Sequence, residues 1–249
     1  MRRALRSGGE SFSPDSDAAS VRRLFALIAR AYDPLNSILS FGLDAGWRKK
    51  LADSLYPMPS GRDGRILDIA AGTLEVSMVL AERFPEHEIA ALDFCLPMLL
   101  RGKKKAMKQR GDKIRLLSGD ARALPLRDAC VDAVTVAFGL RNIRPRERAY
   151  AEALRVLRPG GRFRVLEFVN TEKPVLFGLY NFYLDRVLPT AGSFFSGNKA
   201  AYRYLADTIS RYPAAEKLDE EMCSAGFAGV RHEIFTAGIV GIHSGEKAA

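Results

Sequence analysis

The fold of this chain is decided by the stretch Arg65-Ile66-Leu67-Asp68-Ile69-Ala70-Ala71-Gly72-Thr73-Leu74-Glu75. Its apolar run from Ile66 to Ala71 is too short for a helix and predicts a strand. The Gly72-Thr73 pair breaks that run, and residues 74–84 follow with helical composition. Strand, glycine turn and helix form the opening unit of an open α/β sheet, in which ligands gather at the carboxyl ends of the strands.

A second apolar run, from Ile89 to Asp93, ends in a carboxylate about twenty positions beyond the glycine turn. A carboxylate in that place can accept hydrogen bonds from both hydroxyls of a ribose. The turn and Asp93 together therefore predict a ligand that contains adenosine.

Strand and helix patterns continue to alternate after this unit. Further strands are expected at 114–118, 131–138 and 162–168, with two closing strands near 229–234 and 238–243. Helices are expected over 96–110 and 146–157, the second ended by Arg158-Pro159-Gly160-Gly161, and near 199–210 and 214–225. The pattern predicts an α/β fold: a doubly wound, Rossmann-like, mostly parallel sheet of seven strands with an N-terminal helical cap.

The domain organisation follows from composition. Residues 1–20 predict a disordered tail without the apolar segment of a secretory signal, and residues 21–249 predict one domain. Residues 21–60 suit a helical cap over a pocket or a surface that rests on lipid headgroups, but plain packing against the sheet explains them equally well. The apolar segment 170–200 is expected to be an insertion over the site.

Composition limits the classes of partner. Hydrophobic residues make up 47% of the chain and charged residues 27%, as in globular proteins, and no apolar run approaches the roughly 18 residues of a spanning helix. The net charge of +9 fits nucleic acid, an anionic membrane or nothing specific. Nucleic acid is disfavoured because the basic cluster at 101–110 lacks interleaved aromatic residues. The three cysteines have no metal-binding spacing, which predicts reduced thiols in a cytoplasmic protein and no metal site.

Seven short motifs carry a resemblance to a known family. They are Tyr32-Asp33-x-Leu35-Asn36-x-x-Leu39-Ser40-x-Gly42 with Trp47, Leu67-Asp68-x-Ala70-x-Gly72-Thr73, Ala137-Phe138-Gly139-Leu140-Arg141-Asn142, Arg155-Val156-Leu157-x-Pro159-Gly160-Gly161, Val165-Leu166-Glu167-Phe168, Tyr202-x-Tyr204-Leu205, and Thr236-Ala237-Gly238-Ile239-Val240 with His243. Together they resemble the class I S-adenosylmethionine-dependent methyltransferases, and more narrowly the ubiquinone/menaquinone biosynthesis C-methyltransferases.

The resemblance implies a cofactor and a set of residues that hold it. The cofactor is S-adenosylmethionine, with its ribose on Asp93 and its methionine part facing Thr73 and the Gly72 backbone. Asp68 is placed to help anchor the methionine amine through the loop. The adenine is expected to contact Asp120 and Ala121, and Ala137 completes the cofactor-binding set.

The resemblance also implies a reaction, the methylation of a ring carbon of a polyprenyl quinol. Arg141, directly or through a water, and Asn142 are the catalytic candidates, because developing phenolate charge needs a cation and fixed donors. Tyr32, Asn36 and His243 are the substrate-binding candidates, although His243 also fits simple packing. The acceptor is a benzoquinol or a naphthoquinol, and its lipid tail predicts peripheral contact with the inner face of the membrane. The sequence indicates no oligomeric state.

The chain departs from the family in the glycine turn, where the usual pattern is Gly-Gly-Thr-Gly-Asp. Here Ala71 and Leu74 replace two glycines and Glu75 replaces the aspartate. If this position requires a left-handed conformation, Leu74 costs roughly 1–2 kcal/mol there, and its side chain could crowd the cofactor. Two alternatives therefore stay open: a methyltransferase for another small molecule or RNA, and a non-catalytic scaffold. A dinucleotide-dependent oxidoreductase is disfavoured because the turn lacks Gly-x-Gly-x-x-Gly.

Overall fold

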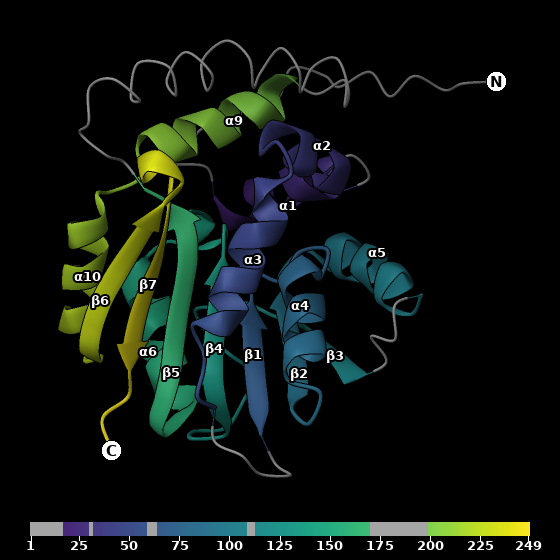
Figure 1. Ribbon diagram of the computed structural model, residues 1–249. Helices are drawn as coiled ribbons and strands as arrows, with labels where there is room; N and C mark the ends of the chain where they lie inside the picture. Colours follow the sequence, from purple (N-terminus) through teal and green to yellow (C-terminus); the bar gives the residue numbers. More distant parts are fainter. Residues whose placement is uncertain (1–16, 30–31, 59–63, 109–112, 170–198) are drawn as a thin grey trace.

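A computed structural model describes residues 17–29, 32–58, 64–108, 113–169 and 199–249 (Figure 1). The helices are α1 (Ala18–Ile28), α2 (Tyr32–Leu39), α3 (Leu43–Asp53), α4 (Glu75–Arg83), α5 (Leu96–Ala106), α6 (Arg146–Val156), α9 (Lys199–Ser210) and α10 (Ala215–Ser224). The strands are β1 (Arg65–Ile69), β2 (Glu88–Asp93), β3 (Ile114–Ser118), β4 (Val131–Ala137), β5 (Leu157–Phe168), β6 (Ala228–Phe235) and β7 (Val240–Glu246).

The strands form one sheet in the order β3-β2-β1-β4-β5-β7-β6. Every pairing among the first five strands is parallel, whereas β7 runs antiparallel to both β5 and β6. The mostly parallel seven-stranded sheet predicted from the sequence is therefore confirmed. Because the chain order reverses between β1 and β4, a crevice opens beyond their carboxyl ends.

The register brings the ends of four strands to one edge. Ile69 of β1 pairs with Leu92 of β2 and Val136 of β4, and Leu92 pairs with Leu117 of β3. Residues that follow these positions therefore meet although they lie far apart in the sequence. The first residues beyond this register are Ala70, Asp93, Ser118 and Ala137.

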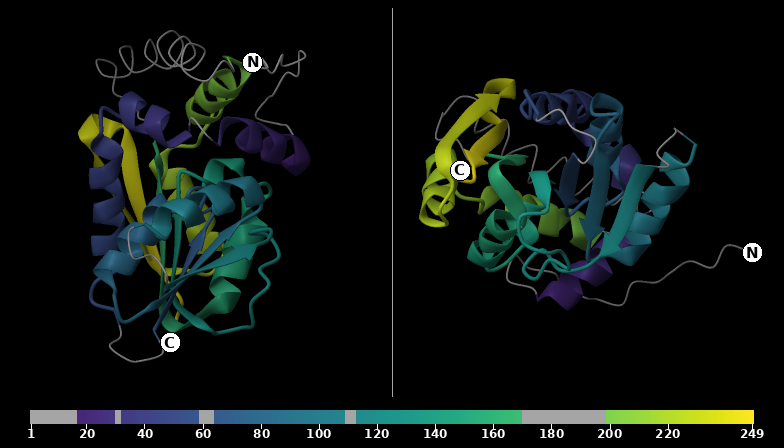
Figure 2. Two further views of the ribbon diagram at one scale, coloured as in Figure 1. Left: turned by 90° about the vertical axis from the view of Figure 1, so that its right-hand side faces the viewer. Right: turned by 90° about the horizontal axis from the view of Figure 1, so that it is seen from below.

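Helices cover both faces of the sheet, as the two views in Figure 2 show. On one face, Trp47 of α3 and Leu80 of α4 pack against strand residues in one apolar cluster. On the other face, Tyr150 of α6 and Met222 of α10 belong to a second cluster. Each large apolar side chain buried in this way contributes roughly 1.5–3 kcal/mol, so the two clusters hold the strand ends in a fixed frame.

Helices α1 and α2 lie at the carboxyl edge of the sheet, and α3 runs from there along one face of the sheet (Figure 1). Helix α9 packs against α1 in a third apolar cluster. Three helices occupy the residues 21–60 for which a helical cap was predicted, and the first of them begins earlier, at Ala18. Asp17 caps α1, because its side chain accepts a hydrogen bond of 2.7 Å from the Ser20 backbone N–H. The predicted tail of residues 1–20 is therefore too long, since Ala18 already belongs to a helix. The predicted insertion of residues 170–200 falls outside the described residues up to 198, and Lys199 begins α9.

The other boundaries differ from the sequence prediction by a few residues. Strand β5 begins at Leu157, which pairs with Val131, so the strand starts before the Pro-Gly-Gly turn that was expected to precede it. Helix α5 ends at Ala106 rather than at 110, and β7 extends to Glu246. Long-range pairing decides these ends, and local composition does not report it.

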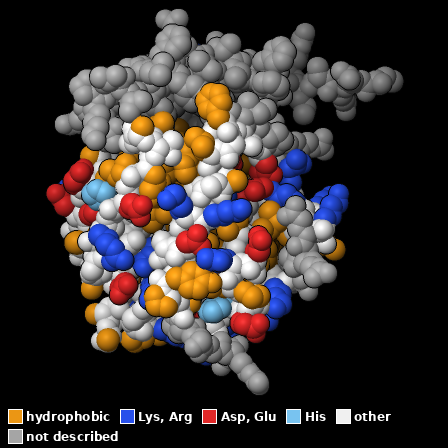
Figure 3. All heavy atoms as spheres, viewed as in Figure 1, with side chains coloured by type: hydrophobic (Ala, Val, Ile, Leu, Met, Phe, Trp, Pro, Cys, Tyr) orange, Lys and Arg blue, Asp and Glu red, His pale blue; other side chains and the backbone are white. Residues whose placement is uncertain are grey.

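The surface carries mixed charge. Lys and Arg side chains alternate with Asp and Glu across the face that α3 and α4 form (Figure 3). Such interleaving is typical of a solvated face and explains part of the basic excess without a partner. Within the described ranges no helix combines the length and the apolarity that a membrane crossing requires.

Candidate active site

The cofactor loop, residues 70–75, joins β1 to α4 through alternating left-handed residues. Ala70, Gly72 and Leu74 have φ angles of 55°, 53° and 68°. Leu74 does adopt the left-handed conformation considered for it, but its side chain does not crowd the cavity. The Leu74 side chain is fully buried in an apolar cluster with Ala91 and Leu99, and it does not line the cavity described below.

Asp93 at the end of β2 holds the cofactor loop in place. One carboxylate oxygen accepts a hydrogen bond of 2.8 Å from the Gly72 N–H, and the other accepts one of 2.7 Å from the Cys95 N–H. Burial raises the pKa of Asp93, and the two backbone donors oppose that shift. Each oxygen retains a lone pair, so the carboxylate can still accept the two hydroxyls of a ribose.

A cavity of about 410 Å³ opens over the strand ends, a size suited to a cofactor. Its floor comes from the segments that follow β1, β2, β3 and β4, and its roof comes from α1, Tyr32 and Tyr204. The lining residues that bear on function are Gly72, Asp93, Phe94, Asp120, Ala121, Arg122, Ala137 and Asn142. Five of the seven predicted cofactor residues therefore lie together at this cavity: Gly72, Asp93, Asp120, Ala121 and Ala137.

Asp120 lies beyond β3 and is clamped by Arg122, a pocket residue that the sequence analysis missed. The guanidinium donates to the carboxylate at 2.6, 3.0 and 3.1 Å, and the Arg122 backbone N–H adds a bond of 2.9 Å. These donors lower the pKa of Asp120, which keeps it ionised. Arg122 also donates to the Arg144 carbonyl at 2.6 Å, so the clamp fixes the adenine-binding candidate to the next loop.

Two predicted cofactor residues, Asp68 and Thr73, lie outside the lining of this cavity. Asp68 is buried, and its carboxylate accepts hydrogen bonds from the hydroxyls of Ser77 at 2.6 Å and Thr135 at 3.0 Å. Burial raises its pKa to about 7. Asp68 therefore joins β1 to α4 and β4 instead of facing a ligand. The Thr73 hydroxyl, also buried, donates to Asp33 of α2.

Asn142, a predicted catalytic residue, and Tyr32, a predicted substrate-binding residue, both line the cavity. The Tyr204 hydroxyl donates to Asn142 Oδ1 at 3.0 Å, which leaves the Asn142 amide nitrogen free to donate to a ligand oxygen. Burial raises the pKa of Tyr32, and Asn36 opposes that shift with a hydrogen bond. Asn36 thus contacts Tyr32 but does not line this cavity.

Arg141, the second catalytic candidate, lies outside the lining of this cavity and is buried. Its Nη1 donates to Glu167 Oε1 at 2.7 Å and to the Phe138 carbonyl at 2.5 Å, and its guanidinium lies over the Phe168 ring at 5.5 Å. Burial opposes the charge of Arg141, but Glu167 together with Tyr32 and Tyr204 outweighs this effect, so the pKa of Arg141 is raised and the side chain stays charged. Within the described part of the chain, the buried Nε has no hydrogen-bond partner.

His243 does not line the cavity, which does not agree with its prediction as a substrate-binding residue. It is fully buried in β7, where its Nδ1 lies 2.7 Å from Asp219 of α10. The same carboxylate lies 2.7 Å from Nδ1 of His232 in β6. Since His243 lies three residues inside the strand and faces α10, its contacts tie the last two strands to that helix.

Similarity to known proteins identifies the family of this chain. The family described as the ubiE/COQ5 methyltransferase family matches residues 14–247. The chain belongs to this family. A demethylmenaquinone methyltransferase from Thermus thermophilus is 45% identical over 90% of this chain and all of that protein. A ubiquinone/menaquinone biosynthesis C-methyltransferase from Methylobacterium nodulans is 39% identical over 94% of this chain and 93% of that protein.

Solved structures confirm the predicted fold. A methyltransferase from Thermotoga maritima is similar with a TM-score of 0.63 at 19% identity, covering 90% of this chain and 99% of that one. The [4+2]-cyclase SpnF is similar with a TM-score of 0.67 at 19% identity, covering 98% of this chain and all of that one. Because the cyclase shares the fold, architecture alone does not decide the reaction. The family does: the chain is an S-adenosylmethionine-dependent methyltransferase, as predicted.

Proposed function

We propose that this methyltransferase acts on a ring carbon of a demethylmenaquinol, a naphthoquinol with a polyprenyl tail. The observation that carries the proposal is the 45% identity with a demethylmenaquinone methyltransferase, all of which the chain covers. A second relative of that name, from Deinococcus radiodurans, is 40% identical over 92% of each chain. The relatives named for both quinones make a benzoquinol the second candidate acceptor.

The residues at the cavity fit S-adenosylmethionine. Asp93 offers two acceptor oxygens for a ribose. Asp120 and Ala121 line the same cavity, and the Asp120 carboxylate can accept a hydrogen bond from an adenine amine. When bound, the cofactor supplies a methyl group on a sulfonium, which a nucleophilic carbon can take. Leu74 does not oppose this fit, because its side chain is buried on the far side of the loop.

The protein must make the quinol carbon nucleophilic and hold it in line. A quinol hydroxyl has to lose its proton, and the Asn142 amide, fixed by Tyr204, can donate to the resulting oxygen. We assign Arg141 a more remote part: it is buried outside the cavity, but its charge interacts with Tyr32 and Tyr204, which line the cavity, so it can stabilise a phenolate there through space. After transfer, the ring carbon releases its own proton and the aromatic ring is restored.

The lipid tail of such an acceptor supports peripheral contact with a membrane. Apolar side chains on the cap face outward: Leu27 is 57% exposed, Phe41 83% and Leu43 47%. Exposed side chains of this kind can insert among lipid headgroups, and the net charge of +9 favours an anionic leaflet.

The test is methyl transfer with the purified protein, reduced demethylmenaquinol in detergent micelles and S-adenosylmethionine with a labelled methyl group. We expect label in the quinol fraction, and loss of that transfer in Asp93→Ala, which lacks the ribose acceptor. A demethylated benzoquinol with the same tail is the matched acceptor. Transfer to the benzoquinol alone would refute the naphthoquinol assignment, and cofactor binding without transfer to either quinol would refute quinol methylation.

A further inference from the structure

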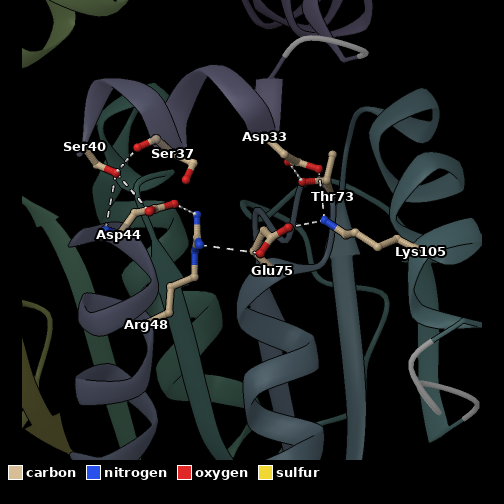
Figure 4. A network of polar contacts seen from close by, with 8 residues as sticks. All are labelled: Asp33, Ser37, Ser40, Asp44, Arg48, Thr73, Glu75 and Lys105. Carbon is tan, nitrogen blue, oxygen red and sulfur yellow. Dashed lines mark hydrogen bonds and ion pairs between the residues drawn. The ribbon is translucent and has the colours of Figure 1, made fainter. Parts of the chain in front are cut away.

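A chain of polar contacts connects the cap to the cofactor loop, as Figure 4 shows. Asp33 of α2 is its centre. One Asp33 oxygen accepts the Thr73 hydroxyl of the cofactor loop, and the other lies 3.0 Å from Lys105 Nζ of α5. A single carboxylate therefore joins three elements: the cap, the cofactor loop and the helix behind that loop.

The chain continues outward with alternating charge. Lys105 also pairs with Glu75 at the start of α4, and Glu75 lies 3.5 Å from Arg48 of α3. Arg48 in turn lies 2.8 Å from Asp44. These side chains are between 10% and 32% exposed, so solvent screens their attraction less than that of a surface pair.

The cofactor loop needs such support because its backbone is strained. Two of its residues with positive φ, Ala70 and Leu74, are not glycine, and each costs roughly 1–2 kcal/mol in a left-handed conformation. Burial of Leu74 offsets part of this cost on one side. Polar contacts also fix two consecutive residues of the loop: Asp93 holds the N–H of Gly72, which lines the cavity, and Asp33 holds the Thr73 hydroxyl, which is buried between the loop and α2.

We propose that Asp33 is a positioning residue for S-adenosylmethionine, acting through Thr73. It holds the cofactor loop in the shape that receives the methionine part, and it docks the cap at the same time. Tyr32, its neighbour in α2, lines the cofactor cavity, so the contact between Asp33 and Thr73 also holds this part of the roof against the cofactor loop. The inference rests on the assigned cofactor but not on which quinol is methylated.

A double-mutant cycle on cofactor affinity tests this role. The variants are Asp33→Ala, Thr73→Val and the double variant, each titrated with S-adenosylmethionine by calorimetry. A hydrogen bond to a charged group contributes enough for each single change to weaken binding about tenfold. Because both changes remove the same contact, we expect the double variant to bind about tenfold more weakly as well, not about a hundredfold.

Three controls separate positioning from general stability. Asp33→Asn retains an acceptor for the Thr73 hydroxyl and should bind the cofactor within about threefold of the native protein. Asp44→Ala removes a carboxylate at the far end of the same chain of contacts and should leave the affinity unchanged. In steady state, Asp33→Ala should raise the KM for S-adenosylmethionine more than the KM for the quinol.

Additive losses in the cycle would overturn the proposal, and so would an Asp33→Ala variant with native affinity. A fall in the melting temperature of Asp33→Ala with no change in cofactor affinity would assign Asp33 a structural role only. None of these outcomes requires a quinol, so the test of Asp33 remains valid even if the protein methylates a different acceptor.

Discussion

The buried ion pair between Arg141 and Glu167 permits a quantitative prediction. Its two side chains are 3% and 0% exposed, and their closest atoms are 2.7 Å apart. The perturbation is Glu167→Gln, which keeps the shape of the side chain but removes its charge. Arg141 then remains buried without its negative partner, although the Phe138 carbonyl and the Phe168 ring still contact it.

The expected loss follows from the burial. Removing one partner of a buried pair costs about 3–5 kcal/mol, because the other charge is left without compensation in a medium of low dielectric constant. For a chain of this size each kcal/mol lowers the melting temperature by roughly 2–4 °C, so Glu167→Gln should melt about 10 °C lower. The second variant, Glu167→Gln with Arg141→Met, replaces the pair by neutral side chains and should recover most of that loss.

The assay is urea unfolding followed by circular dichroism, supported by thermal melting. The matched control is Glu220→Gln, which breaks the pair between Lys217 and Glu220; that pair has a similar distance, 2.9 Å, but side chains 61% and 65% exposed. It should not measurably shift the midpoint, because solvent screens exposed pairs. Equal shifts in Glu167→Gln and Glu220→Gln would refute the reasoning, as would a double variant less stable than Glu167→Gln alone.

Three further changes probe the cofactor loop and its support. Leu74→Gly should be at least as stable as Leu74→Ala in urea unfolding, against the usual order, because both lose the buried side chain but only glycine relieves the left-handed strain. Gly102→Ala should lower stability by about 1–3 kcal/mol, since its Cβ would meet the Thr73 carbonyl oxygen at 2.7 Å; a native unfolding midpoint would contradict this. The folded pKa of Asp68, about 7, exceeds its ordinary value of 3.8, so the folded state binds more protons between these values and loses stability as pH rises. Asp68→Asn lacks this titration, so its free energy of unfolding should rise relative to that of the native protein between pH 3.8 and about 7. A stability difference that does not change with pH would exclude a raised pKa for Asp68.

The main features of the cofactor site were predictable because they depend on local pattern. Strand, glycine turn and helix around Gly72 define the nucleotide-binding unit, and Asp93 ends the next strand at the expected separation. Parallel strands align their carboxyl ends, so residues after each strand had to converge on one edge. Gly72, Asp93, Asp120, Ala121 and Ala137 all reach the cavity for this reason.

The residues that were misplaced depend on orientation and partners. Asp68 lies in the predicted strand, but its side chain contacts Ser77 and Thr135. Side chains alternate along a strand, and this one points to the face of the sheet that α4 covers. His243 was assigned near the substrate from its position in a motif, yet the antiparallel register of β7 places it beneath α10. Arg122 was not predicted, since only the closed turn after β3 brings it onto Asp120.

The sequence by itself determined the fold class, the family and the edge of the sheet where the cofactor binds, because periodicity and strand ends are local properties. Tertiary structure alone decided what Leu74 does: the same left-handed backbone that the sequence suggested turns its side chain into a core cluster and leaves the cavity clear. It also decided that Asp33, about forty residues before Thr73, holds the cofactor loop from the cap. Contacts of that kind form only when distant segments pack, so no local pattern encodes them.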